Sequence, residues 1–451
     1  MECESPGDGA FFLGPDPCIM CIMKPGRLAS KEQTSIKTTI SALGPQGDGL
    51  AVGDGRRVYI PGALPGEMVR ATLREQMDRG VYKASLDEII TASPQRVAAP
   101  CVHYKQCGGC ALQHLEMGAY RAWKVEQVRA RLEKAGLHPD IWDDPVFIPE
   151  ATRRRATFAV LKRGGTLLAG FHGSRSHTIV AIDRCLLLVP ELTDILERSK
   201  PYLLRVLTDG QAADLLLQGV DGQIEGVLTG KIESNLAALE AFSDWTNDLN
   251  LNRLSKRRNE RDEPEIVVQR QPVLARFGPL CVALPPAAFL QPGREGEAAL
   301  ADAVRVLLEG EKGPSADLFA GCGTFSGALL ALGAVHAVEI DGPAAAALTS
   351  AGAGYNLRVE KRNLFTNPLI PRELDKFNNV LLDPPRAGAS AQALQLAASR
   401  VRHIVYISCN PASFARDAAI LCEGGYRLRR VRIVDQFIWS THTELAALFT
   451  R

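Results

Sequence analysis

The sequence lacks the features that mark membrane, secreted and fibrous proteins. No apolar run in its 451 residues approaches the ~18–20 residues that a membrane-spanning helix requires. Its first residues, MECESPGDGAFFLG, lack the basic start and the long apolar stretch of a signal peptide. Its 40 glycines and 27 prolines stay well below the ~25–30% of low-complexity chains. We therefore expect a cytoplasmic protein built from several globular domains.

The sequence also lacks an excess of charge of either sign. Its 52 basic and 51 acidic residues leave a net charge of +1, so any nucleic-acid-binding face must come from locally clustered arginines. Eleven cysteines, an odd number in a chain without a secretion signal, argue against a disulfide framework. They favour metal-binding or catalytic cysteines instead.

The first ninety residues fall into two parts. Residues 1–33 show no lasting periodicity and are expected to form a disordered tail, in which Cys18 and Cys21 make an isolated C-x-x-C pair. Residues 34–93 alternate apolar and polar side chains in short runs broken by glycine turns, which predicts a small β-barrel. Such barrels commonly bind oligonucleotides, although a solvated β-surface explains the arginines in these runs equally well.

The middle of the chain is predicted to be rich in β-structure. After CVHYKQCGGC, a helical pattern spans residues 112–137, and apolar runs predict strands at residues 153–160, 167–171 and 178–182. The charged run at residues 252–264 is expected to be an exposed loop. From Gln291 onward strands and helices alternate, which is typical of a doubly wound α/β domain with a mainly parallel sheet.

Three closely spaced cysteines suggest a metal site. Cys101, Cys107 and Cys110 follow the spacing C-x5-C-x2-C, and Cys185 is the nearest candidate for a fourth ligand. Thiolates favour iron–sulfur clusters, zinc or copper(I). The spacing leaves an iron–sulfur cluster, a zinc site and plain cysteine packing open.

A glycine-rich turn at ADLFAGCGTFSG lies between a predicted strand and a helix, where ligands approach the carboxyl edge of an α/β sheet. Glu339 ends the next strand and can accept hydrogen bonds from ribose hydroxyls. The absence of a P-loop and of G-x-G-x-x-G favours S-adenosylmethionine over ATP or NAD. Asp383, in LLDPPRAG, is a second strand-end carboxylate, for which helix capping is the alternative role.

Two residues near the end of the chain are candidates for covalent catalysis. Cys409 in SCNP follows an apolar strand, and the N-terminus of the next helix can stabilise a thiolate at this position. Glu444, in HTELAALF, is a carboxylate that can remove a proton after a covalent step. A buried packing cysteine and an ordinary loop acid are the simpler interpretations.

Taken in order, C-x5-C-G-G-C, DPPRAG, SCNP and a terminal H-x-E resemble the motifs of the S-adenosylmethionine-dependent RNA 5-methyluridine methyltransferases. The resemblance covers nearly the whole chain after residue 33 and is nearest to the branch that modifies uracil C5 in 23S rRNA. It implies a multidomain α/β protein. An OB/TRAM-like RNA-binding barrel would span residues 34–93, and a central β-rich α+β domain with an iron–sulfur segment would span 94–290. A Rossmann-like class I methyltransferase domain would span 291–451.

The resemblance also implies the cofactors and the site residues. A 4Fe-4S cluster would be bound by Cys101, Cys107, Cys110 and Cys185. S-adenosylmethionine would be bound by Gln291, Phe319, Thr324, Glu339, Asn363 and Asp383. The chain departs from the family pattern at Gly293, where an asparagine is frequent, and at Asn363, where an aspartate is frequent. Cys409 would add to C6 of uracil, and Glu444 would remove the C5 proton.

The implied partner is a structured RNA, for which ribosomal RNA is preferred and tRNA is the alternative. We expect no DNA or membrane partner and a monomer. A target base in structured RNA must be turned out of its stack to reach such a site. The arginines that are candidates for phosphate contacts, or else solvated surface residues, are Arg153, Arg154, Arg155, Arg427, Arg429, Arg430 and Arg432.

Three other functions fit the sequence less well. Amino-group methylation of adenine uses a D/N-P-P-aromatic loop, whereas Arg386 follows the prolines here. Radical S-adenosylmethionine chemistry is disfavoured because its C-x3-C-x2-C spacing is absent. A non-catalytic RNA-binding or ribosome-assembly factor with a structural cluster is the alternative from a different class.

Overall fold

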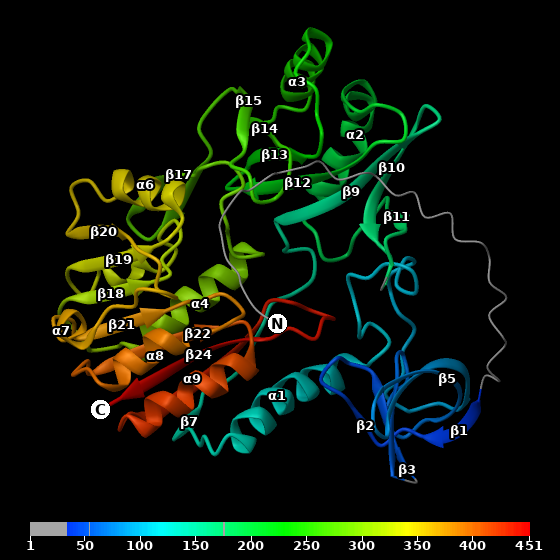
Figure 1. Ribbon diagram of the computed structural model, residues 1–451, viewed down its shortest axis with the longest axis horizontal. Helices are drawn as coiled ribbons and strands as arrows, with labels where there is room; N and C mark the ends of the chain where they lie inside the picture. The colour runs from blue at the N-terminus through cyan, green and yellow to red at the C-terminus, as the bar shows by residue number, and fades with distance from the viewer. Residues whose placement is uncertain (1–33, 54, 175) are drawn as a thin grey trace, which may run out of the picture.

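The computed structural model describes residues 34–53, 55–174 and 176–451. Figure 1 shows one sheet at the lower right, a second at the top and a third at the left, in chain order from blue to red. The predicted tail, residues 1–33 with Cys18 and Cys21, lies outside the described residues.

The first sheet has its own apolar core. Its strands run in the order β1-β5-β6-β4-β3-β2. They are β1 (Ser35–Thr39), β2 (Ala42–Leu43), β3 (Gly49–Gly53), β4 (Arg56–Ile60), β5 (Met68–Asp78) and β6 (Val81–Thr91). Ile60, Val69 and Ala71 are fully buried between them. The predicted alternating runs therefore do form strands, with alternate residues facing inward.

Helix α1 (Met117–Lys134) connects this sheet to the end of the chain. Its buried residues Tyr120, Lys124, Val128 and Leu132 are four apart and so lie on one face. The helix starts five residues later than predicted because residues 112–116 form turns. In those turns the N–H groups of Ala111 and Leu112 donate to the carbonyl of Trp439 at 2.8 and 3.1 Å.

The central sheet is covered by two helices. Its strand order is β11-β10-β9-β12-β13-β14-β15. The elements are β9 (Arg155–Arg163), β10 (Thr166–His172), β11 (Ile179–Ala181), α2 (Pro190–Val206), β12 (Ala212–Val220), β13 (Gln223–Thr229), α3 (Leu236–Asp248), β14 (Arg253–Arg257) and β15 (Glu265–Gln269). Phe158, Leu203, Phe242 and Trp245 are fully buried in its core. The three predicted strands are confirmed as β9, β10 and β11.

The prediction of an exposed loop over residues 252–264 was wrong for its first half. Residues 253–257 form strand β14, which is almost entirely buried. The Arg253 guanidinium donates to the Glu225 carboxylate and, at 2.8 Å, to the Leu284 carbonyl. A charged run can thus enter a sheet when buried partners neutralise it.

Replacing Arg253 with methionine is expected to lower the free energy of unfolding by about 3–5 kcal/mol, because the buried Glu225 would lose its counter-charge. Urea denaturation checks this. The double variant Arg253→Met/Glu225→Gln should recover part of the loss. An Arg253→Met protein as stable as the unmodified one would contradict the buried pair.

The third sheet is doubly wound. A hairpin of β16 (Leu274–Phe277) and β17 (Leu280–Ala283) precedes it, and its strand order is β20-β19-β18-β21-β22-β24-β23-β7. Its strands are β18 (Ser315–Leu318), β19 (Val335–Glu339), β20 (Leu357–Lys361), β21 (Asn379–Leu382), β22 (His403–Ser408), β23 (Arg427–Asp435) and β24 (Glu444–Thr450). Its helices are α4 (Arg294–Leu307), α5 (Ser326–Leu329), α6 (Gly342–Ala351), α7 (Pro371–Leu374), α8 (Ser390–Ala397) and α9 (Pro411–Glu423). The order of these elements along the chain confirms the predicted alternation of strands and helices from Gln291 onward.

Successive residues of each strand serve opposite faces of this sheet. Val380 and Leu382 of β21 pack in the cluster that holds α1, α8 and α9, whereas Leu381 between them packs in the cluster that holds α4. Both faces are therefore covered, as a parallel sheet requires.

The outer edge of the third sheet is formed by residues from much earlier in the chain. The short strands β7 (Ile141–Trp142) and β8 (Val146–Phe147) pair in parallel with β23. Asp140 and Asp143 beside them form ion pairs with the arginines of β23. The sheet thus combines residues from both sides of the boundary expected at residue 290.

Candidate active site and cysteine cavity

The candidate residues meet at one edge of the third sheet. Strands β18, β19, β21 and β22 are parallel, and Phe319, Glu339, Asp383 and Cys409 lie at their carboxyl ends. Strand β24 runs antiparallel to β22 and pairs Leu445 with Ser408, so Glu444 begins at the same edge. This is the edge at which open α/β sheets bind ligands.

The glycine-rich turn after β18 is fixed by Glu339. One carboxylate oxygen of Glu339 accepts the Gly321 N–H at 2.8 Å, and the other accepts the N–H groups of Ile340 and Asp341 at 2.8 and 2.7 Å. The oxygen that accepts the Gly321 N–H keeps a lone pair for a further donor, whereas the other oxygen already accepts two. The carboxylate therefore closes the turn and can still accept a ribose hydroxyl.

Phe319 carries backbone strain at this turn. Its φ angle is +65°, a conformation that costs a non-glycine residue of the order of 1–3 kcal/mol. Its ring lies 5.4 Å from that of Phe365, whose N–H donates to the Asn363 side chain at 3.0 Å. Phe319 and Asn363 are thus brought together, and Thr324 is half-buried in the same turn.

The Cys409 thiol lies between acidic groups. Burial, with the nearby carboxylates of Glu444 and Asp383, raises the pKa of Cys409, and the Arg386 guanidinium opposes this shift. Asn410 caps helix α9 by accepting the Ala412 N–H at 3.0 Å, and its side-chain amide donates to the Arg386 carbonyl at 3.0 Å. The SCNP and DPPR segments are therefore joined directly.

The two carboxylates beside the thiol, those of Glu444 and Asp383, both have raised pKa values. Burial raises the pKa of Glu444 to about 7. Burial, Glu444 and Asp317 together raise the pKa of Asp383 well above its ordinary value. A carboxylate with a pKa near neutrality is suited to general-base catalysis.

Gln291 reaches the site through a residue that the sequence did not indicate. The Gln436 amide nitrogen donates to the Gln291 side-chain oxygen at 2.8 Å and also to a Glu444 carboxylate oxygen. All three side chains are buried. No local motif marks Gln436, because its role depends on a loop that folds back beneath α4.

The four candidate cysteines line one cavity of about 900 Å³, with arginines around them. Burial, followed by the charges of Cys185, Cys107 and Cys101, raises the pKa of Cys110 to about 12, apart from a lowering contribution from Gln113. The Gly108 N–H donates to the His172 carbonyl at 3.1 Å, which holds the first three cysteines against strand β10. Folding therefore brings Cys185 to the three clustered cysteines.

No group of three or more His, Cys, Asp or Glu side chains in the described ranges is close enough to bind a single metal ion. In a 4Fe-4S cluster each cysteine binds a different iron atom, so its cysteine sulfurs do not converge on one point. Four thiols around one cavity suit such a cluster better than they suit zinc, whose ligands share one centre.

Comparison with known proteins identifies the family. Residues 358–451 match the family model described as tRNA (Uracil-5-)-methyltransferase. An RNA methyltransferase of Brucella suis is 39% identical, over 93% of this chain and 99% of its own. The 23S rRNA (uracil(1939)-C(5))-methyltransferase of Pseudomonas putida is 35% identical, over 91% of this chain and 92% of its own.

The chain belongs to the RNA (uracil-5-)-methyltransferase family. It is therefore an S-adenosylmethionine-dependent RNA (uracil-5-)-methyltransferase. The fold agrees, since a Pyrococcus abyssi tRNA (uracil-54, C5)-methyltransferase with bound S-adenosyl-L-homocysteine superposes with a TM-score of 0.69. That match is 22% identical and covers 92% of this chain and 99% of the other. Among the described residues, no helix is both long and apolar enough to span a membrane.

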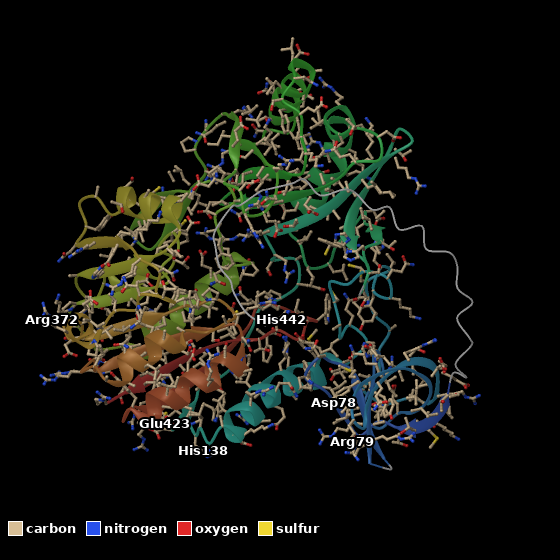
Figure 2. All side chains as sticks on the ribbon, viewed as in Figure 1. Asp78, Arg79, His138, Arg372, Glu423 and His442 are labelled. Carbon is tan, nitrogen blue, oxygen red and sulfur yellow. The ribbon has the colours of Figure 1, made fainter. Side chains whose placement is uncertain are left out.

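A second network anchors the loop that precedes Glu444 in this methyltransferase. Figure 2 shows His442 near the middle of the view, on the loop between β23 and β24. The buried Lys124 ammonium donates to the His442 carbonyl and, at 2.9 Å, to Asp435. The Tyr120 hydroxyl donates to the other Asp435 oxygen at 2.6 Å. Helix α1 thus holds both ends of the loop that leads to Glu444.

Most of the candidate RNA-binding arginines have acidic partners. Those of β23 pair with Asp140, Asp143 and Asp302, as the ion pairs of Arg427, Arg429, Arg430 and Arg432 show. Arg154 is buried against Glu297 at 2.6 Å. Arg153 and Arg155 instead line the cysteine cavity, over the rings of Phe437 and Phe289.

Proposed function

We propose that this methyltransferase acts on C5 of a specific uridine in 23S rRNA through a covalent adduct between Cys409 and C6 of the base. The convergence of Cys409, Glu444 and Asp383 at one sheet edge carries the proposal. The likeness over nearly the full length of the P. putida enzyme supports 23S rRNA as the substrate.

The reaction needs a nucleophile and a base because uracil C5 is a poor nucleophile. Addition of the Cys409 thiolate to C6 makes C5 an enolate carbon, whose electron pair forms a bond to a methyl group. Bound S-adenosylmethionine supplies that methyl group from its sulfonium and leaves as the neutral thioether. Glu444 then takes the C5 proton, the C5–C6 double bond re-forms, and Cys409 departs as a thiolate.

The cofactor would lie along the carboxyl edge of β18, β19 and β21. The residues proposed to bind it are Gln291, Phe319, Thr324, Glu339, Asn363 and Asp383. The strained turn at Phe319 and the remaining lone pair of Glu339 support this assignment. Asp383 lies close enough to Glu444 and Asp317 for their charges to interact, so it would also face the uracil.

An RNA containing 5-fluorouridine tests the covalent mechanism. Fluorine at C5 cannot leave as a proton, so the methylated adduct with Cys409 should survive a denaturing gel. Absence of any adduct, with RNA binding intact, would sink the proposal. It would favour a non-catalytic RNA-binding role or methylation of a different atom.

Mapping of methylated uridines decides between the possible RNAs. A strain that lacks this protein should lose 5-methyluridine at one site in 23S rRNA and keep every site in tRNA. The matching family model and the P. abyssi structure both name tRNA, so loss of a tRNA site is the second candidate. That result would replace the ribosomal assignment while leaving the chemistry unchanged.

We further propose that Cys101, Cys107, Cys110 and Cys185 bind a 4Fe-4S cluster and that the first sheet is a TRAM-like RNA-binding barrel. Cys185→Ser is expected to lose most of the iron and the visible absorbance of the purified protein, because one thiolate ligand is removed. The exposed Cys281 offers a matched control. If Cys281→Ser and Cys185→Ser retain equal iron, the ligand assignment is wrong.

A further inference from the structure

Gln436 links two residues that have separate roles in the proposed function. Its amide nitrogen has two hydrogens, and they go to the side-chain oxygen of Gln291 and to the carboxylate of Glu444. Gln291 lies just before α4 on the expected cofactor side, and Glu444 begins β24. One buried side chain thus joins the cofactor side to the base.

The space for Gln436 is built into helix α4. A Cβ atom on Gly296 would lie 2.9 Å from the Gln436 Cβ and nearer still to its Oε1. Glycine at this position is what lets the Gln436 side chain lie beneath the first turn of α4.

The orientation of the Gln436 amide depends on Glu444. Its Oε1 is buried and has no hydrogen-bond partner among the described residues. The reversed amide would point Oε1 at Gln291 Oε1 and at an ionised carboxylate, which are both acceptors. The observed orientation therefore gives Glu444 an N–H donor, which favours its ionised form.

The other groups around Glu444 disfavour its charge. Burial raises the pKa of Glu444, the Gln436 N–H lowers it, and the charge of Asp435 at the end of β23 raises it further. Asp383 after β21 and Cys409 after β22 are further acidic groups within electrostatic reach. The nearby cations have other partners, since Lys124 pairs with Asp435, and Arg386 lies beside Cys409 and His442.

We propose that Gln436 is a positioning residue that keeps Glu444 ionised as the proton acceptor and ties that state to Gln291. The inference rests on the proposed function of Glu444. Once Glu444 has taken the C5 proton, its O–H needs an acceptor. Reversal of the Gln436 amide supplies Oε1 for this purpose and breaks the contact with Gln291. Protonation of Glu444 is thereby coupled to loss of the hydrogen bond between Gln436 and Gln291 on the cofactor side.

The test is the pH dependence with which the methylated covalent intermediate breaks down. Gln436→Met keeps the length of the side chain and removes both N–H donors. The midpoint of the pH dependence of this rate is expected to move toward higher pH by about one pH unit, because the charged Glu444 loses the Gln436 N–H donor. Gly296→Ala, which displaces Gln436 without touching Glu444, should produce a shift in the same direction.

Gln392→Met is the matched control. Gln392 is a fully buried glutamine of α8 whose side chain bonds both the N–H and the carbonyl of Leu369. Its variant should lose stability and keep the pH midpoint of the unmodified protein. If Gln436→Met and Gly296→Ala also keep that midpoint, Gln436 does not act through Glu444. If the unmodified protein forms no adduct with 5-fluorouridine RNA, the proposed function itself is wrong.

Discussion

Replacing Cys409 with alanine is expected to reduce methyl transfer by at least about 10⁴-fold, because the thiolate that adds to C6 is lost. Cofactor binding should be unchanged, since the residues expected to bind S-adenosylmethionine are intact. Because burial and two carboxylates raise the pKa of Cys409, the rate of adduct formation in the unmodified protein should keep rising with pH beyond neutrality. Transfer of labelled methyl groups into RNA and calorimetry with S-adenosylmethionine measure these quantities.

Cys422→Ala provides the control for this experiment. Cys422 is also half-buried and lies in α9, the helix that follows Cys409, but it packs against the apolar core near the opposite end of that helix. Its variant should keep activity within about twofold of the unmodified protein. If Cys409→Ala retains turnover, the covalent route is excluded and methylation proceeds by direct transfer.

Replacing Glu444 with glutamine is expected to trap the methylated covalent intermediate. The thiol can still add to C6 and the methyl group can still reach C5, but no base removes the C5 proton. Turnover should fall by about 10²–10⁴-fold, while an RNA–protein adduct that carries the labelled methyl group accumulates on denaturing gels. The glutamine carbonyl can still accept the Gln436 hydrogen bond, so the loop should keep its conformation.

The double variant Cys409→Ala/Glu444→Gln must form no adduct, which separates a trapped intermediate from non-specific cross-linking. Glu444→Gln should also be more stable above pH 7. The pKa of Glu444 is about 7 in the folded protein and lower when unfolded, so its ionisation destabilises the fold as pH rises through this range. A stable, RNA-binding Glu444→Gln protein without adduct would show that another group is the base.

The strand-end residues could be predicted from the sequence because their signal is local. Asp383 and Cys409 each follow an apolar strand, and parallel strands place their carboxyl ends at one edge. Glu444 lies at the same edge because it begins the final strand, β24, which runs antiparallel to β22. Periodicity and strand order therefore carry most of the active-site prediction.

Residues whose role depends on distant partners could not be found in this way. Lys124 and Asp435 lie more than three hundred positions apart, and neither segment indicates the other. The sequence predicts exposed or RNA-binding arginines in β14 and β23, because it does not reveal that Glu225 or Asp143 neutralises them. The Gln436 side chain occupies space that is left by the missing Cβ of Gly296, and the sequence does not show that these two residues pack together.

The short strands β7 and β8 have a consequence for solubility. They cover the outer side of β23, which would otherwise present unpaired backbone N–H and carbonyl groups to other chains. A fragment that begins at Gln291 would contain every residue of the proposed catalytic edge and yet leave that side of β23 open. Such a fragment should self-associate through β23, whereas one that begins at Met117 should keep the strand covered.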